Sequence, residues 1–416
     1  MYLVKTVSIK DQAFIKEADS LMFLSKNLYN SALYIERQQF FTKRDQLKAG
    51  VNDRKTRWYY SSFDLYKKMS AEQQPDFEAL PSGVAQRIVS QAAKSFKAFL
   101  ELREVDPVNA RMPHYLDKLN GRNMLTFGLN TISKPALRDR KLKLCCLSNV
   151  LDLPPEIENP GQLRELTIHP LRNGEMTARF VYEVPDVEMT EPNGRTAGID
   201  LGVNNLATVV TNTGEMPPLI IPGGPVKSIN QQYNRRMAYL KSRRDKEEKS
   251  TRITNSMKTL HRRRKHRIED YMHKSTRKIA DQLASLNISA VVVGHNKEWK
   301  QEANIGKINN QRFVSIPHDR FIKMLSYKCA LKGIRLVETE EAWTSKCSFF
   351  DRESLEHHEE YLGKRIRRGL FKTSQGLLVN ADVNGALNIM RKVFSDVTLK
   401  SNYGIAGCGS PVRIRV

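Results

Sequence analysis

The sequence predicts a multidomain α/β protein. With 416 residues it is long enough for two or three hydrophobic cores, and its 40% hydrophobic content is ordinary for a globular chain. Short segments with alternating apolar residues indicate strands, and segments with apolar residues three and four positions apart indicate helices. From residue 197 onward these segments follow in the order three strands, a long helical connection, strand, helix, strand and helix. This is the element order of an RNase H-like fold.

The first half of the chain has strand patterns on both sides of a helical stretch. YLVKTVSIK alternates like a strand, and MLTFGL, ELTIHP and ARFVYEV repeat that pattern between 112 and 188. In VAQRIVSQAAKSFKAFLEL the helical spacing puts six apolar residues on one face: Ala85, Ile88, Val89, Ala92, Phe96 and Phe99. We therefore predict a small β-barrel from residues 1–12 and 109–190, with a helical domain of residues 13–108 inserted after its first strand.

The second half begins at the turn signal EPNGRT. AGIDLGVNNLATVVTNTGEMPPLIIPGG predicts three strands, and the polar stretch 226–282 predicts a basic helical hairpin. SAVVVG and IRLVETEE predict two further strands, and VNGALNIMRKV predicts a final helix. The predicted divisions are a core of residues 191–342 and 377–395, a charged insertion at 343–376 and a loose tail at 396–416.

Positive charge is the strongest global signal. The chain has 68 Lys and Arg against 45 Asp and Glu, which gives a net charge of +23. Such an excess favours a polyanionic partner that binds through its phosphates. Acids are sparse in the predicted hairpin, and cations placed there would hold a nucleic-acid backbone without reading its sequence. The expected nucleic-acid-binding residues are Arg235, Arg236, Lys241, Arg243, Arg244, Arg262, Arg263, Arg264, Lys265 and Arg267.

Other features of the composition exclude several classes of protein. No apolar run reaches the roughly 20 residues that span a bilayer, and the amino terminus lacks the pattern of a signal peptide. We therefore expect no membrane partner and a cytosolic location. The five cysteines show no disulfide framework and no paired C-x-x-C motifs, so we expect reduced thiols and no zinc.

Two aspartates occupy positions where an RNase H-like fold places carboxylates. Asp200 lies between Ile199 and Leu201 on an alternating strand, so its side chain faces away from theirs. An acid in the middle of an apolar strand needs a metal or another partner. Asp382 precedes the final helix, where an Asp is also a common helix cap, but its place in the element order favours a metal. Two divalent cations about 4 Å apart, clamping an attacking water and a leaving phosphate oxygen, need several such carboxylates.

Four motifs together resemble the TnpB family. They are GIDLGVNNLAT, HKSTRKIA in the basic hairpin, TSK with Cys347, and NADVNGALNI. TnpB is the RNA-guided DNA endonuclease of bacterial insertion sequences and a relative of type V CRISPR effectors. The resemblance covers nearly the whole chain and implies a RuvC nuclease core, a wedge domain in the barrel and a recognition domain in the inserted helices. It also implies Mg²⁺ or Mn²⁺, a guide RNA from the element's own end, and a double-stranded DNA target with a short adjacent motif.

This sequence departs from the family in two places. The family's fourth strand ends with a glutamate, whereas Gly294 stands here. The family also has paired C-x-x-C knuckles between the fifth strand and the last helix, and here only Cys347 of CSFF remains. The first departure removes an expected catalytic acid, and the second agrees with the expectation of no zinc.

A replacement acid is expected from the next strand. IRLVETEE should run parallel to its neighbours, so its carboxyl end emerges at the same rim as Gly294, which leaves room for another side chain. Alternation puts Glu338 and Glu340 on one face and Glu341 on the other, unless the strand has already ended. Glu298 reaches the site only if its loop folds back. The predicted catalytic residues are Asp200, Glu340, Glu341 and Asp382, and the predicted metal ligands are Asp200, Glu340 and Asp382.

The leading hypothesis is a metal-dependent, RNA-guided endodeoxyribonuclease that hydrolyses target phosphodiesters with two metals and a relocated glutamate. The alternative is an RNA-guided DNA-binding protein that does not cleave and acts as a repressor. A DNA transposase would need the three acids but no guide, and the long basic hairpin argues against it.

Overall fold

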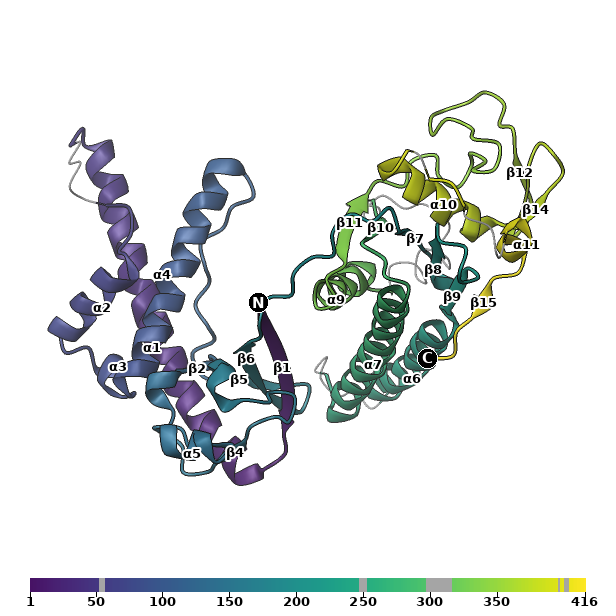
Figure 1. The fold of residues 1–416 in the computed structure, drawn as a ribbon. Coiled ribbons are helices and arrows are strands. Elements are labelled where there is room, and N and C mark those ends of the chain that lie inside the picture. Colours follow the sequence, from purple (N-terminus) through teal and green to yellow (C-terminus); the bar gives the residue numbers. More distant parts are fainter. Residues whose placement is uncertain (52–56, 247–252, 297–315, 396, 400–403) are drawn as a thin grey trace. The chain divides into compact units, whose positions relative to one another are not determined.

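The chain folds into two compact units, Met1–Pro185 and Asp186–Val416 (Figure 1). The computed structural model describes residues 1–51, 57–246, 253–296, 316–395, 397–399 and 404–416. Each unit has its own buried apolar core. Among the helices of these ranges, none combines the length and the apolar character that crossing a bilayer requires.

Four helices form the helical part of the first unit. They are α1 (Gln12–Lys48), α2 (Ser62–Ala71), α3 (Pro75–Glu78) and α4 (Ser82–Val105). α1 begins after Asp11, whose carboxylate accepts hydrogen bonds from the N–H groups of Ala13 and Phe14. α4 packs against α1, and the six apolar residues predicted to share one face of α4 are all buried. The predicted amphipathic helix is therefore confirmed.

The main strands of the first unit form an open antiparallel sheet. Its order is β1 (Tyr2–Ile9), β6 (Glu175–Glu183), β5 (Leu163–Arg172) and β2 (Leu125–Gly128). A separate ribbon and three short helices complete the unit: β3 (Lys141–Leu142) with β4 (Leu151–Asp152), η1 (Leu129–Thr131), α5 (Lys134–Arg138) and η2 (Pro160–Gln162). β1 and β2 lie at opposite edges, so the sheet does not close into the predicted barrel. Apolar side chains of the helices and of the sheet form one core. The helices therefore bury the inner face of the sheet, and the sheet does not need to close into a barrel.

Glu36 is a buried carboxyl within α1. One of its oxygens accepts a hydrogen bond from the Tyr60 N–H at 2.9 Å, and the other has no partner among the described residues. Burial raises the pKa of Glu36 from 4.5 to about 7. The unfolded chain therefore ionises Glu36 at a lower pH than the folded protein does.

We predict that Glu36 makes the first unit less stable as the pH rises from about 4.5 to about 7. Below this window both states are protonated; within it only the unfolded state ionises, so the free energy of unfolding falls, by on the order of 2 kcal/mol. Glu36→Gln should remove this dependence and leave the protein more stable at alkaline pH. Urea denaturation of both proteins at about pH 5 and about pH 8 measures the effect. Parallel pH profiles would contradict the prediction.

A mixed six-stranded sheet forms the centre of the second unit. Its order is β11 (Arg335–Thr339), β10 (Ala290–Gly294), β7 (Thr196–Leu201), β8 (Asn205–Thr211), β9 (Leu219–Pro222) and β15 (Val412–Arg413). β7, β8 and β9 form the predicted antiparallel meander, and β10 and β11 run parallel to β7. The fifth predicted strand, β11, lies beside the fourth, β10, and runs parallel to it as expected.

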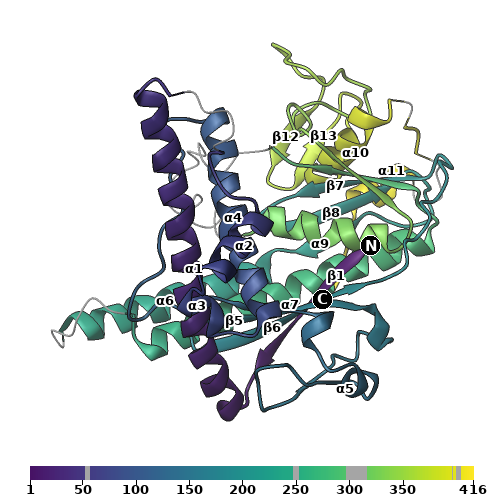
Figure 2. The same ribbon diagram turned by 90° about the vertical axis from the view of Figure 1, so that its left-hand side faces the viewer.

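Helices cover both faces of this sheet (Figure 2). α6 (Gly224–Lys246) and α7 (Asn255–Ser285) pack against each other as the predicted hairpin. Side chains of α7 and α9 (His318–Ala330) share a core with Ile199 and Leu201 on one face. α10 (Ala381–Val393) packs against β7, β8 and β10 on the other face. Alternation along β7 therefore directs Asp200 toward α10.

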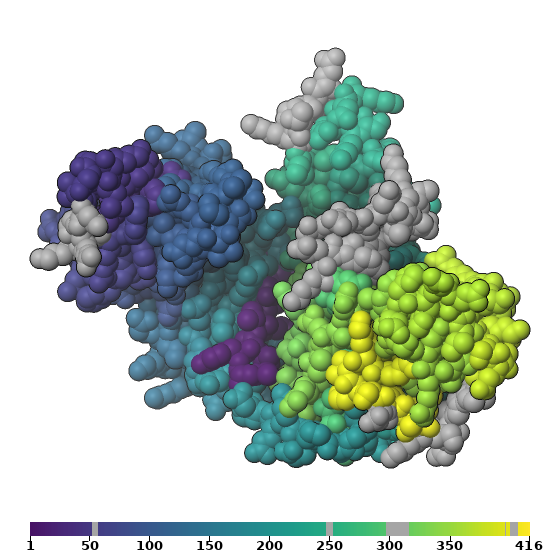
Figure 3. Space-filling view, turned by 90° about the horizontal axis from the view of Figure 1, so that it is seen from above, coloured from purple at the N-terminus to yellow at the C-terminus, as the bar shows by residue number. Residues whose placement is uncertain are grey.

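Two strands of the predicted charged insertion form a small sheet with a third strand that follows the insertion. β12 (Lys364–Arg367), β13 (Leu370–Lys372) and β14 (Leu378–Asn380) form a three-stranded antiparallel sheet. β14 leads directly into α10. In the space-filling view the yellow-green residues of this region lie side by side with yellow residues of the C-terminal part (Figure 3).

The prediction of a loose tail is wrong for its described end. α11 (Gly404–Gly409) contacts β14, and β15 pairs in parallel with β9. Ile414 and Val416 pack against the core of the sheet. The alternating apolar residues of PVRIRV form a strand because the edge of β9 offers unpaired backbone groups.

Candidate active site

Asp200 lies near the end of β7 with its side chain on the α10 face. Its neighbours Ile199 and Leu201 are buried in the core on the opposite face, which confirms the predicted alternation. Gly385 of α10 lies over the carboxylate, because a Cβ added at Gly385 would stand 3.1 Å from Asp200 Oδ2. The absence of a side chain at position 385 therefore allows α10 to approach Asp200 closely.

Gly294 lies beside Asp200 in the neighbouring strand. β10 and β7 pair in parallel with Val293 opposite Ile199, so Gly294 comes next to Asp200 one residue further along. A Cβ added at position 294 would stand 2.6 Å from Glu341 Cγ and 2.7 Å from Glu341 Oε1. The side chain of Glu341 thus fills the space that a side chain at position 294 would occupy.

The chain turn after β11 directs Glu341 into this position. β11 ends at Thr339, and the Asn296 side chain accepts a hydrogen bond from the Glu341 N–H at 2.9 Å. The Glu341 carbonyl accepts hydrogen bonds from the N–H and the hydroxyl of Thr344 at 3.2 and 2.8 Å. Trp343, between them, has a φ of 67°, a conformation that a bulky residue adopts only when its surroundings hold it. The turn is therefore fixed by several contacts.

The structure does not bring Glu340 to this site. Its side chain is exposed, and Glu338 is exposed as well, with one carboxylate oxygen 3.3 Å from His295 Nδ1. Strand pairing ends before Glu340, so the alternation of β11 does not extend to it. Of the two predicted glutamates, the structure therefore places Glu341 and not Glu340 beside Gly294, and metal binding by either one stays a prediction. Glu298 lies outside the described residues.

Asp382 lies in the first turn of α10 but does not cap the helix. Asn380 is the cap, because its side chain accepts hydrogen bonds from the N–H groups of Asp382 and Val383. The Asp382 carboxylate accepts a hydrogen bond from Asn205 Nδ2 at 2.6 Å and pairs with Arg365 Nη2 at 3.3 Å. The cap interpretation of Asp382 is therefore wrong, and the carboxylate faces the residues of the site.

The three carboxyls of Asp200, Glu341 and Asp382 influence one another. Burial raises the pKa of Asp200 well above its usual range, the charges of Glu341 and Asp382 raise it further, and Arg365 lowers it. Burial also raises the pKa of Glu341 to about 7. Among the described residues no hydrogen-bond partner exists for the buried Glu341 Oε1, or for the buried hydroxyl of Thr208, which pairs with Asp200 across β7 and β8.

The donor set fits a hard divalent cation. Carboxylate oxygens are the preferred ligands of Mg²⁺ and Mn²⁺, and a cation would offset the repulsion among the three acids. An unpaired buried oxygen such as Glu341 Oε1 is suited to the same partner. Within the described part of the chain, no three His, Cys, Asp or Glu side chains already stand together in a way that could hold a metal ion. The carboxylates of the site would therefore have to draw closer around it.

Two family models match the segments that form this site. Residues 179–300, which include Asp200 and Gly294, match the OrfB_IS605 model, described as a probable transposase. Residues 318–389, which include Glu341 and Asp382, match the Cas12f1-like TNB domain. The chain is a relative of the TnpB and Cas12f proteins.

This relative of TnpB and Cas12f is similar to proteins of a virus and an archaeon. It is 23% identical over 406 residues to the TnpB-like protein ORF457 of Acidianus two-tailed virus, covering 89% of this chain and 81% of that protein. It is 26% identical over 235 residues to the CRISPR-associated endodeoxyribonuclease Cas12f2 of Micrarchaeota archaeon (strain CG1_02_47_40). The second match covers 52% of this chain and 40% of Cas12f2, so it spans less than half of that relative.

A solved structure shares the fold. The match is to a chain of the cryo-EM structure of the Cas12f1–sgRNA–target DNA complex, with a TM-score of 0.59 and 17% identity. It covers 90% of this chain and 82% of the solved chain. The mixed α/β fold is therefore similar to that of a Cas12 effector nuclease.

The cations predicted to bind nucleic acid lie on the α6–α7 hairpin of this TnpB relative. The exposed members are Arg235, Arg236, Lys241, Arg243, Arg263, Lys265 and Arg267, and the half-buried members are Arg244, Arg262 and Arg264. Arg264 joins the two helices, because its Nε donates to Asn230 Oδ1 at 2.6 Å and its guanidinium lies over the Tyr233 ring. The structure thus places the cations together on the hairpin, and their binding role remains a prediction.

Sequence analysis does not identify two residues of the site. The NN pair after β7 predicts only a turn, yet Asn205 holds Asp382. Arg365 lies in the charged insertion, where no periodicity distinguishes it from the neighbouring cations. The pairing of β12 with β13, and of β13 with the strand β14 that leads into α10, brings Arg365 to Asp382.

Two carboxylates, those of Asp351 and Glu353, stabilise the charged insertion that follows the site. Glu353 is buried, and its two oxygens accept hydrogen bonds from the N–H groups of Ser348 and Leu362 at 2.6 and 2.8 Å. The Asp351 carboxylate accepts hydrogen bonds from the N–H and hydroxyl of Ser374 at 3.0 and 2.5 Å. Burial and the nearby Glu353 raise the pKa of the Cys347 thiol, which disfavours the thiolate that zinc requires.

We predict that Glu353, and no bound zinc, stabilises this segment. Glu353→Ala leaves two N–H groups without their partner and should lower the unfolding free energy by on the order of 2–4 kcal/mol. The matched control is Glu359→Ala, because Glu359 is an exposed acid of the same segment. Thermal unfolding of the three proteins with and without a zinc chelator measures both effects. A loss of stability on chelation of the wild type would show that zinc is held here after all.

Proposed function

We propose that this protein is an RNA-guided DNA endonuclease whose third catalytic carboxylate is Glu341. The observation that supports this proposal most directly is the position of the Glu341 side chain, which fills the space over Gly294 beside Asp200. Glu341 thus stands where the family resemblance leads us to expect the acid of position 294. Cas12f2, named an endodeoxyribonuclease, and the Cas12f1 complex with sgRNA and target DNA support the reaction class and the partners.

In this proposal the carboxylates of Asp200, Glu341 and Asp382 would hold two divalent cations, Mg²⁺ or Mn²⁺, and the chemistry supplied there would be activation of water and stabilisation of the leaving oxygen of the phosphodiester. Asn205 orients Asp382 through its 2.6 Å hydrogen bond. Arg365 provides positive charge at the rim, where the phosphodiester enters. Ile389, whose Cδ1 would stand 2.6 Å from a Cβ at position 294, closes the apolar side of the site and excludes water there.

The basic hairpin supplies the nucleic-acid contacts in this proposal. Its cations would bind phosphates of the guide RNA paired with target DNA, whose sequence is read by base pairing. The guide would come from the end of the protein's own element, and the target would be double-stranded DNA with a short adjacent motif. Binding of this kind should weaken steeply as salt rises.

The test is cleavage of a matched double-stranded DNA by the protein purified with its flanking RNA. The reaction is run with Mg²⁺, with EDTA and with a mismatched DNA, beside an assay of DNA binding. Cleavage that needs both the metal and the match is the expected result. Tight guide-dependent binding without cleavage would instead identify a DNA-binding protein that represses by occupancy.

A further inference from the structure

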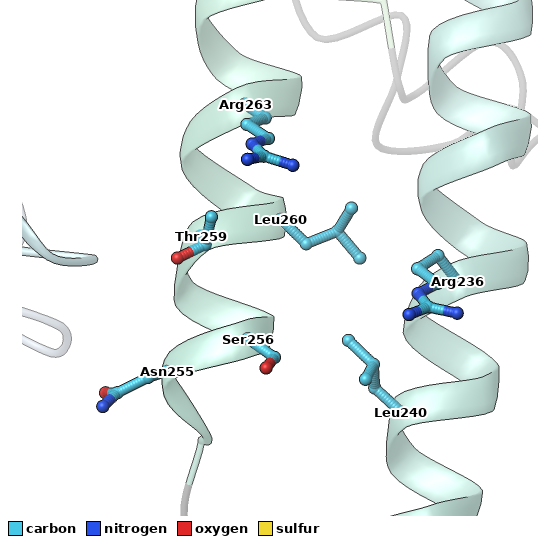
Figure 4. Close-up of a pocket in the computed structure, with 7 residues that line it drawn as sticks. All are labelled: Arg236, Leu240, Asn255, Ser256, Thr259, Leu260 and Arg263. Carbon is cyan, nitrogen blue, oxygen red and sulfur yellow. The ribbon is translucent and has the colours of Figure 1, made fainter.

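The α6–α7 hairpin contains a pocket of about 380 Å³ between its two helices (Figure 4). Arg236 and Leu240 line it from α6, and Leu260 and Arg263 line it from α7, with Ser256 and Thr259 at the N-terminal end of α7. Both guanidiniums and both leucine side chains point into the space between the helices. Cations and apolar groups thus face the same volume.

Among the described residues, no ion pair or hydrogen bond of the two pocket guanidiniums joins α6 to α7. Neither Arg236 nor Arg263 forms an ion pair or a hydrogen bond with any residue of the described ranges, and the Arg236 guanidinium lies 4.9 Å from the centre of the Tyr239 ring. Nearby Arg264 and Arg267, by contrast, donate to Asn230 and Gln232 of α6. Two like charges that line one pocket repel each other, and an anion between them would turn that repulsion into attraction.

The leucine side chains of the pocket favour an anion that also has an apolar part. Leu240 and Leu260 are half-buried in a hairpin whose other surface is strongly polar, and they face the same pocket. A bare phosphate makes no use of such walls, whereas the sugar and base of a nucleotide do. The first turn of α7, which carries Ser256, adds backbone N–H groups at the positive end of a 31-residue helix.

We propose that this pocket binds one nucleotide of a single-stranded polynucleotide. The phosphate lies between Arg236 and Arg263, and the sugar and base lie against Leu240 and Leu260. A duplex does not fit this description, because its bases are stacked and paired and cannot reach the leucines. The inference rests on the proposed function in one respect, which is that the hairpin binds nucleic acid. It adds that the pocket binds a single strand lying outside the guide–target duplex.

The test measures binding of labelled oligonucleotides to the full chain, purified free of nucleic acid and without a guide or added metal. The probes are oligouridine and oligothymidine of about ten nucleotides and a duplex of the same length. Arg236→Ala and Arg263→Ala should each weaken single-strand binding by about tenfold, and Arg235→Ala, which removes an equal charge from the exposed surface beside the pocket, by less than about threefold. Leu240→Ala and Leu260→Ala should weaken single-strand binding by about fivefold and leave duplex binding unchanged.

Two results would overturn the inference. In the first, the Arg236 and Arg263 variants weaken single-strand binding no more than Arg235→Ala does, and the leucine variants do not weaken it. Such a result would mean that the hairpin binds through its positive charge alone. In the second, uridine monophosphate displaces the strand at the concentration at which the strand displaces itself, which identifies a free nucleotide as the ligand. A loss confined to oligouridine or to oligothymidine supports the proposal and names the strand as RNA or DNA. The assay uses no guide and no metal and does not measure cleavage. A negative result would therefore refute the pocket proposal and leave the nuclease proposal untouched.

Discussion

Glu341→Ala is expected to reduce metal-dependent DNA cleavage by on the order of 10³-fold and to leave guide-dependent DNA binding intact. The expectation follows from position: the Glu341 side chain stands over Gly294, beside Asp200, with one oxygen buried and without a partner among the described residues. Glu341→Gln keeps the shape but not the charge, so it should lose nearly as much activity. Cleavage rates with saturating guide and Mg²⁺, beside binding constants, measure the effect.

Glu340→Ala is the matched control for this variant. Glu340 is the adjacent acid, and its exposed side chain lies outside the site, so its loss should change the cleavage rate by less than about threefold. Burial raises the pKa of Glu341, which means that the ionised carboxylate is unfavourable in the folded protein. Glu341→Ala should therefore leave the protein folded, and thermal unfolding without metal checks this. If Glu341→Ala cleaved DNA as fast as the wild type, or if Glu340→Ala did not cleave it, the proposal that Glu341 is the catalytic acid would be refuted.

Gly294→Glu should abolish cleavage in the wild-type background and restore it in the Glu341→Ala background. A Cβ at position 294 would stand 2.6 Å from both Glu341 Cγ and Ile389 Cδ1, so two glutamates cannot share the space without displacing each other. With Glu341 shortened to alanine, the new carboxylate can take the place beside Asp200. We expect the double variant to cut at least about tenfold faster than Glu341→Ala alone.

Gly294→Ala is the control for this pair, because it adds only the Cβ and no charge. It should disturb Glu341 and lower cleavage in the wild-type background, and it should restore nothing in the Glu341→Ala background. If Gly294→Glu and Gly294→Ala behaved alike in both backgrounds, the two positions would not be alternatives for one carboxylate. Rates for all variants under single-turnover conditions decide the point.

The parts of the site that local patterns determine could be predicted from the sequence. Asp200 interrupts an apolar strand, so alternation alone sets its face, and the element order predicts the strand meander and the parallel strands after it. Asp382 follows from the same order, although only the structure shows that Asn380 caps the helix and leaves Asp382 to the site.

The choice between Glu340 and Glu341 could not be predicted, because it depends on the residue at which β11 ends. A shift of one residue moves a strand side chain to the other face, and here the strand stops at Thr339 and the chain turns. Arg365 could not be predicted because its contact arises from tertiary pairing. The final strand is different, since the alternating residues of PVRIRV were visible in the sequence and an edge of the sheet was free to receive them.

The order of the strands and helices of the second unit along the chain has a consequence during protein synthesis. β7 brings Asp200 early, whereas Asp382 comes from α10 and the edge of the sheet is completed by β15. Chains fold from the amino terminus as they leave the ribosome. A nascent chain that has emerged only as far as β11 therefore holds its basic hairpin and one aspartate but lacks the helix that brings Asp382 to them. Under the proposed function, such a polypeptide would present its nucleic-acid-binding hairpin before its three carboxylates are assembled, so the order of the sequence would delay cleavage until that surface has formed.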